Sequence, residues 1–159
     1  MTNDEGGTAA LTTIVMLPLL LVVLVGVLEM GALRAVAYRA GAAADLATIV
    51  AVGDQDQFEL AQSGKLRLAA DAADVARDYF ARNLSATEPA LGASANAIAA
   101  SADIASFPTA PSFDPRTGAH YDRPTVRLIA SIPVRTPGFA ALLMPAVTTV
   151  TIHSLSSPR

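Results

Sequence analysis

The stretch IVMLPLLLVVLVGVL, residues 14–28, decides the fold of this 159-residue chain. Segment 6–28 carries no charged side chain, and roughly 20 apolar residues suffice for a helix to cross a ~30 Å hydrocarbon core. The preceding residues, MTNDEGG, include Asp4 and Glu5 but no lysine or arginine, unlike the basic start of a secretory signal peptide. We therefore favour a retained membrane-spanning helix over a cleavable signal. A buried core helix is the poorest alternative, because the remaining chain is too small and polar to surround it.

The helical pattern continues past this run to residue 51 without another proline. Alanine, the best helix former, dominates the extension, and one helix over residues 8–52 would be about 65 Å long. Pro18 removes a helical hydrogen bond and is expected to kink or loosen the helix. The small residues Gly26, Gly31, Ala35 and Ala42 would let a neighbouring helix approach closely.

The remainder of the chain predicts a small mixed domain. Residues 65–83 (KLRLAADAADVARDYFARN) have the spacing of an amphipathic helix. Residues 95–106 alternate weakly and are interpreted as a strand, and the proline-rich segment 107–122 as an exposed loop or hairpin tip. Residues 124–135 and 146–155 are rich in β-branched side chains and predict strands.

These elements predict an α+β fold: a long N-terminal transmembrane helix extending into a second helix and a small antiparallel β-sheet of about three strands. We divide the chain into a leader (1–7), a transmembrane and extended helix (8–53) and an α+β head (54–159).

Composition argues against several classes of function. The chain is 52% hydrophobic and 16% charged, with a mean hydropathy of +0.44. It has no cysteine, which excludes disulfides, thiolate zinc sites and thiol nucleophiles. A net charge of -3 and a single lysine, Lys65, argue against nucleic-acid binding.

No set of residues has the pattern of a catalytic site. Asp71, Asp74 and Asp78 share a helix face, which favours a solvated stripe over a cation site. The two serines beside His153, Ser154 and Ser156, lack the setting of a nucleophile elbow.

The proline-rich segment holds one further candidate. Asp114, His120 and Asp122 fall together there and could bind a cation, although an exposed polar loop also explains them. We expect no enzymatic activity, no metal, no cofactor and no small-molecule substrate.

The N-terminal residues resemble a known family. The segment 7–18, GTAALTTIVMLP, is followed by an apolar run, by Glu29-Met30-Gly31 and by a small-residue helix. This order is similar to that of TadE/TadG-like pseudopilins, minor pilins of tight-adherence (Flp-type) pilus systems. The terminal strands resemble those of the same family, whereas residues 54–121 resemble it only weakly.

The resemblance implies a membrane-anchored subunit that takes part in assembling a Tad/Flp-type pilus or related secretion filament. It implies processing by a prepilin peptidase between Gly7 and Thr8, and helix packing or a kink at Pro18, Gly26, Glu29 and Gly31. The implied partners are other pilins or pseudopilins, the inner-membrane assembly platform and the lipid bilayer.

Two departures from the family pattern refine this expectation. The family usually has a glutamate five residues after the processing glycine, where this chain has Thr12, which fits a minor subunit better than a bulk one. Arg34 and Arg39 follow the span, so the positive-inside rule would place the head in the cytoplasm. We follow the resemblance, which implies a single-pass protein of the bacterial cytoplasmic membrane with an extracytoplasmic head. The alternative is a single-pass envelope protein that serves as a scaffold or binding module in a membrane complex unrelated to pili.

Overall fold

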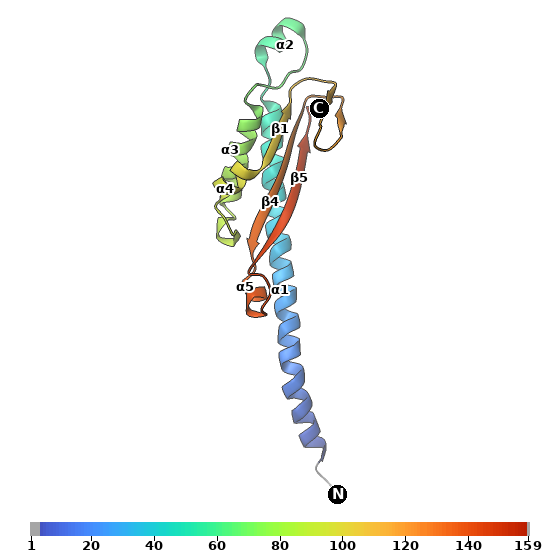
Figure 1. Ribbon diagram of the computed structural model, residues 1–159, viewed down its shortest axis with the longest axis vertical. Helices are drawn as coiled ribbons and strands as arrows, with labels where there is room; N and C mark the ends of the chain where they lie inside the picture. The colour runs from blue at the N-terminus through green and yellow to red at the C-terminus, as the bar shows by residue number, and fades with distance from the viewer. Residues whose placement is uncertain (1–3, 159) are drawn as a thin grey trace.

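The helix α1 (Asp4–Gly53) runs along most of the length of the molecule, and all other elements gather beside its C-terminal half or beyond that end (Figure 1). The structure is a computed structural model that describes the backbone of residues 4–158 and the side chains of residues 12–158. The expected α+β class, with a long apolar helix followed by helices and a three-stranded antiparallel sheet, is confirmed.

The long helix is continuous through Pro18 and through the glycines Gly26, Gly31 and Gly41. It begins at Asp4, so the backbone of Gly7 and Thr8 is already helical, while the side chain of Thr8 lies outside the described residues. The helix ends at Gly53, where the polar segment of the chain begins.

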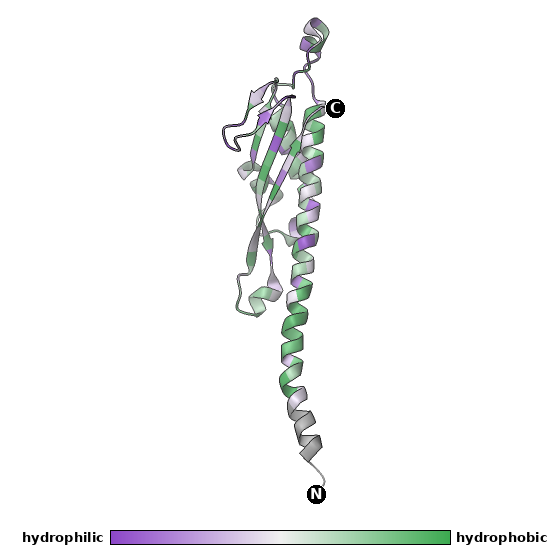
Figure 2. Cartoon of the chain, turned by 90° about the vertical axis from the view of Figure 1, so that its right-hand side faces the viewer, coloured by the Kyte–Doolittle hydropathy of each residue, from purple (hydrophilic) through white to green (hydrophobic). Residues whose placement is uncertain are grey.

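The two halves of α1 have different surroundings. From Ile14 to Leu24 the large apolar side chains are exposed by 47–71%. From Glu29 onward a stripe at helical spacing is buried against the head, and it comprises Glu29, Leu33, Val36, Ala40, Ala44, Ala47 and Ala51. The described residues contain one helix that is long and apolar enough to cross a membrane, with a mean hydropathy of 2.6 in its most apolar window. Figure 2 shows this hydrophobic half projecting away from the head.

The helices of the head differ from the expected ones. The amphipathic helix expected from residue 65 is α3 (Ala72–Ser85), and it begins seven residues later. The preceding segment is extended instead, because Leu68 forms a β-bridge with Gln55 and its N–H bonds the carbonyl of Pro108. A short helix, α2 (Gln57–Ser63), occupies the polar segment that follows α1.

The expected strand over residues 95–106 is wrong in its first half. Residues Ala95–Ser101 form the helix α4, which Ser94 caps by accepting a hydrogen bond from Ala97 N–H at 3.2 Å. Strand β1 (Asp103–Phe107) follows directly. The weak alternation of small residues therefore belongs to an alanine-rich helix with a serine cap. A short 3₁₀ helix, η1 (Glu88–Ala90), precedes it.

The sheet has the strand order β1-β4-β5 and is antiparallel throughout. The central strand β4 (Thr125–Arg135) pairs with β1 on one side and with β5 (Val147–Ser156) on the other. The expected strands at 124–135 and 146–155 therefore form, and a short helix, α5 (Pro137–Ala141), lies in the connection between them. The two-residue strands β2 (Ser112–Phe113) and β3 (His120–Tyr121) form a hairpin within the proline-rich segment.

The main core lies between the sheet, α3, α4 and the head-facing stripe of α1. Four alanines of that stripe, Ala40, Ala44, Ala47 and Ala51, have no exposed surface. Small side chains allow the sheet and α3 to pack close to the α1 backbone, while Phe80 of α3 supplies the largest buried side chain. This packing fixes the β4–β5 connection beside the middle of α1.

Candidate functional site at the α1–α5 junction

The β4–β5 connection meets α1 where the exposed apolar half ends. Glu29, only 9% exposed, accepts a hydrogen bond from the backbone N–H of Gly138 at the start of α5. Pro137 fits the first position of this short helix because its ring presets φ and no N–H is needed there. The carboxylate therefore satisfies an N–H that the first turn of α5 leaves without a helical partner.

The contact leaves little room for a side chain at position 138. A Cβ at this position would lie 2.5 Å from Glu29 Oε1, 2.8 Å from Glu29 Cγ and 2.9 Å from Val25 Cγ1. By contrast, Gly26 and Gly31 have nothing within 4 Å of an added Cβ. Gly138 thus lies where two distant segments approach closely, as does Gly92, whose added Cβ would lie 3.2 Å from Pro133 Cβ and from Val147 Cγ1. Local sequence patterns did not single out Gly138.

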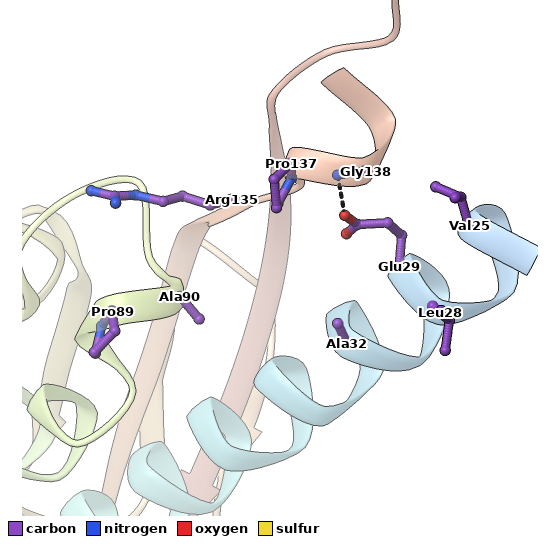
Figure 3. Close-up of a pocket in the computed structure, with 9 residues that line it drawn as sticks. All are labelled: Val25, Leu28, Glu29, Ala32, Pro89, Ala90, Arg135, Pro137 and Gly138. Atoms are coloured by element: carbon purple, nitrogen blue, oxygen red, sulfur yellow. Dashed lines mark hydrogen bonds between the residues drawn. The ribbon is translucent and has the colours of Figure 1, made fainter. Parts of the chain in front are cut away.

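A hollow of about 550 Å³ lies beside this contact (Figure 3). Its lining is mainly apolar and consists of Val25, Leu28, Glu29, Ala32, Pro89, Ala90, Arg135, Pro137 and Gly138. The Glu29 carboxylate points toward Gly138, whereas the Arg135 side chain extends away from it (Figure 3). The hollow offers contact with an apolar group but no arrangement of acid, base and nucleophile.

The turn that follows α5 has a fixed shape. Met144 N–H donates to the carbonyl of Phe139 at 2.9 Å, and Leu143 N–H donates to that of Ala140 at 3.1 Å. At the base of the loop, the buried Thr136 donates its hydroxyl to the carbonyl of Pro145 and its N–H to that of Ala146. Phe139 packs against the main core. The loop is therefore held from its inner side.

The outer side of the same turn is apolar and open. Leu143 is 99% exposed and Met144 is 51% exposed. Leu143 has φ of +60°, a left-handed conformation that costs a residue with a Cβ roughly 1–2 kcal/mol. Neither packing nor backbone preference within this chain favours a leucine at that position.

The predicted helix-packing residues take different places at this junction. Glu29 faces the head, whereas Gly31 lies on the exposed surface of α1 and Gly26 is half-buried. Pro18 lies inside α1 among exposed apolar side chains. Gly31 and Ala35 line the face opposite the head, together with the exposed Tyr38 and Ile49. Ala42 and Leu46 instead border a hollow beside Asn83, at the C-terminal end of α3.

The candidate cation site in the proline-rich segment is occupied by protein groups. Asp114 is 1% exposed, and its Oδ2 lies 2.8 Å from Arg127 Nε, an ion pair without the alignment of a hydrogen bond. Its carboxylate also accepts hydrogen bonds from Thr117 Oγ1 at 2.7 Å and from Arg116 N–H at 2.9 Å. Burial raises the pKa of Asp114, but these hydrogen bonds and the Arg127 charge outweigh that effect and lower the pKa below its usual value.

The rest of this cluster has a structural role as well. Arg127 NH1 donates to Asp103 Oδ2 at 2.6 Å, which links β4 to β1. His120 packs its ring against Phe113 across the short hairpin, with centroids 4.8 Å apart. Asp114 is therefore not part of an exposed polar loop as expected, but is the buried anchor of the hairpin.

The serines near His153 also take part in packing. Ser154 Oγ donates to Asp45 Oδ1 at 2.7 Å, and Thr48 Oγ1 lies 2.9 Å from the hydroxyls of both Ser154 and Ser156. These contacts fasten β5 to α1 through polar groups in a largely apolar interface.

The three aspartates of α3 and its N-terminus lie on the surface. Asp71 precedes the first turn, Asp78 is exposed, and Asp74 pairs with Arg77 at 2.6 Å. Among the residues with described side chains, no group of three or more histidines and acids is placed to hold a metal ion.

A comparison with protein-family models, with curated proteins and with solved structures finds no match for this chain.

Proposed function

We propose that this chain is a membrane-anchored, pilin-like minor subunit that takes part in assembling a Tad/Flp-type pilus or a related secretion filament. The observation that carries the proposal is the division of α1 into an exposed apolar half and a half that serves as the spine of an α+β head. An exposed half of this kind is suited to lipid, and the head is held beside the membrane by a continuous helix.

The free face of α1 supports a role in assembly. At the level of the head, Gly31 and Ala35 leave room beside the backbone, and Tyr38 and Ile49 add surface that is 80% and 59% exposed. Helices pack closely where small residues face each other. In the proposed role this face meets the helix of a neighbouring subunit while the head remains outside the contact.

The second candidate is a single-pass envelope protein that acts as a scaffold in a complex unrelated to pili. Thr12 favours it, because pilins of the resembled family usually carry a glutamate at this position. In this case the apolar half of α1 would still anchor the protein, but no filament would form.

Surface filaments from cells that carry an epitope-tagged copy separate the two candidates. The pilus proposal predicts that the tagged chain is found in sheared filaments or that its deletion abolishes them. Ala35→Trp, on the free face of α1, should prevent filament assembly, whereas Ala61→Trp, at an exposed position of α2, should not. Normal filaments in the deletion strain, with the tagged chain absent from them, would refute the proposal in favour of the scaffold.

N-terminal sequencing of the membrane-bound protein tests the processing step separately. A mature chain that begins at Thr8 is the expected result, since the resemblance implies cleavage after Gly7. A chain that retains the residues before Gly7 would show that prepilin peptidase does not process it.

A further inference from the structure

The turn after α5 lies level with the end of the apolar half of α1. Gly138 donates to Glu29, and an added Cβ at Gly138 would also meet Val25, which lies one helical turn nearer the N-terminus. Both ribbon views place α5 and its turn at the end of the head nearest the projecting half of α1 (Figures 1 and 2). The turn is thus the part of the head nearest to that half.

Helix geometry relates this level to the edge of a bilayer. Twenty residues of helix rise about 30 Å, the thickness of the hydrocarbon core. The twenty residues that end at Leu28, the last residue before Glu29, are residues 9–28, which lie within the uncharged segment 6–28. A bilayer that covers the apolar half of α1 therefore has its head-side boundary close to Glu29, beside α5.

The chemistry of the turn suits that boundary. Residues 136–152 carry no charged side chain, and the outward-facing Leu143 and Met144 are held in place by the hydrogen bonds that close the turn. Arg135, exposed at the end of β4, lies on the side of the turn toward the head. An apolar tip beside a basic side chain matches the order of acyl chains and phosphate groups at a membrane surface.

We propose that the α5 turn inserts Leu143 and Met144 into the head-side leaflet of the membrane that α1 spans. The turn is then a second point of membrane contact, and together with α1 it fixes the tilt and height of the head above the bilayer. This inference rests on the membrane anchoring in the proposed function, and it holds for either orientation of the chain.

Tryptophan fluorescence provides a direct test, because the chain contains no tryptophan. The full-length variant Leu143→Trp is reconstituted into phosphatidylcholine–phosphatidylglycerol vesicles whose phosphatidylcholine is brominated on the acyl chains near the glycerol end. We expect emission that is blue-shifted and quenched by the bromolipid, as for a side chain at the headgroup–acyl boundary. Phe58 provides the control, because it is 70% exposed and lies on α2 at the far end of the head. Phe58→Trp should show neither the blue shift nor the quenching.

Two further variants make each outcome decisive. Met144→Trp should be quenched like Leu143→Trp, and it repeats the measurement should Leu143→Trp not fold. Val22→Trp reports on the span itself. If Val22→Trp is quenched while both turn variants resemble Phe58→Trp, the inference fails and the anchoring stands.

Of the two remaining outcomes, one would also refute the membrane span, and the other would assign the turn to contact with a second copy of the chain. An unquenched Val22→Trp would refute the span, and with it both the proposed function and the inference. Turn emission that is blue-shifted, unquenched and lost when the protein is diluted in the bilayer would instead place a second copy of the chain against the turn, which also overturns insertion.

Discussion

The substitution Gly138→Ala tests how the head is fastened to α1. Its Cβ would lie 2.8 Å and 2.9 Å from carbon atoms of Glu29 and Val25, whereas non-bonded carbons prefer about 3.5–4.0 Å. Either the start of α5 or the side chains of Glu29 and Val25 must therefore shift by roughly 0.7 Å or more. Either shift is expected to break the hydrogen bond from the N–H of residue 138 to the Glu29 carboxylate. A hydrogen bond to a charged group contributes about 1.5–3 kcal/mol.

Hydrogen exchange of the full-length protein in detergent micelles measures this loss locally. Because 1.4 kcal/mol corresponds to a factor of ten, amides of residues 138–144 should exchange about 10-fold to 150-fold faster after correction for intrinsic rates. Amides in the middle of β4 should keep their protection, since opening of the turn does not require unfolding of the sheet.

The double variant identifies the cause. Glu29→Ala removes both the acceptor and the atoms that an alanine at 138 would meet most closely. Glu29→Ala alone should raise exchange in the turn, and adding Gly138→Ala should then have a smaller effect than it has in the original chain, because only the contact with Val25 is left to disturb. Unchanged exchange in Gly138→Ala, or effects of the two substitutions that simply add, would refute the claim that this close approach holds α5.

Three further predictions concern α1 and the hairpin. Gly41→Ala should raise the free energy of unfolding by about 0.5–1 kcal/mol in urea titrations, because an added Cβ meets nothing within 4 Å and alanine favours a helix. Ala44→Leu should lower it by about 1–3 kcal/mol through overpacking, whereas Ala42→Leu on the exposed face should leave it nearly unchanged. The folded-state pKa of Asp114 is lower than its unfolded value, so its stabilising effect is complete above that unfolded value, near 3.8, and is lost as pH falls through the folded pKa. Urea titrations below about pH 4 should therefore show a flatter loss of stability in Asp114→Asn than in the original chain, and equal slopes would contradict this assignment.

Local sequence patterns predicted the elements whose residues determine their own conformation. The apolar run and the alanine extension predicted α1, and alternating β-branched residues predicted β4 and β5. The helix α4 has a local signal, because Ser94 followed by ANAIAAS combines a cap with strong helix formers. The late start of α3 has no local signal, because the conformation of Leu68 is set by a bridge to Gln55 and a hydrogen bond to Pro108.

The polar contacts of the site depend on tertiary structure alone. Glu29 and Gly138 are separated by 109 positions, and no periodicity joins them. No local pattern joins Arg127 and Asp114 either. The sequence around Asp114 predicts an exposed loop, and only the tertiary structure places Arg127 beside its carboxylate. Glu29 did carry one local signal, since it is the first member of the stripe that continues through Leu33 and Val36.

The place of Glu29 explains how an acidic residue can directly follow a long uncharged segment. A helix alone in lipid would have to expose this carboxylate to hydrocarbon or withdraw it toward water, because an unpaired charge in an apolar environment is costly. Here the carboxylate faces the head, and Gly138 N–H is its partner. The depth of α1 in a membrane would then be set by the helix and head together, because displacing α5 would leave the acid unpaired at the boundary. A weakened Glu29–Gly138 contact should therefore alter the position of the head relative to the membrane as well as the stability of the turn.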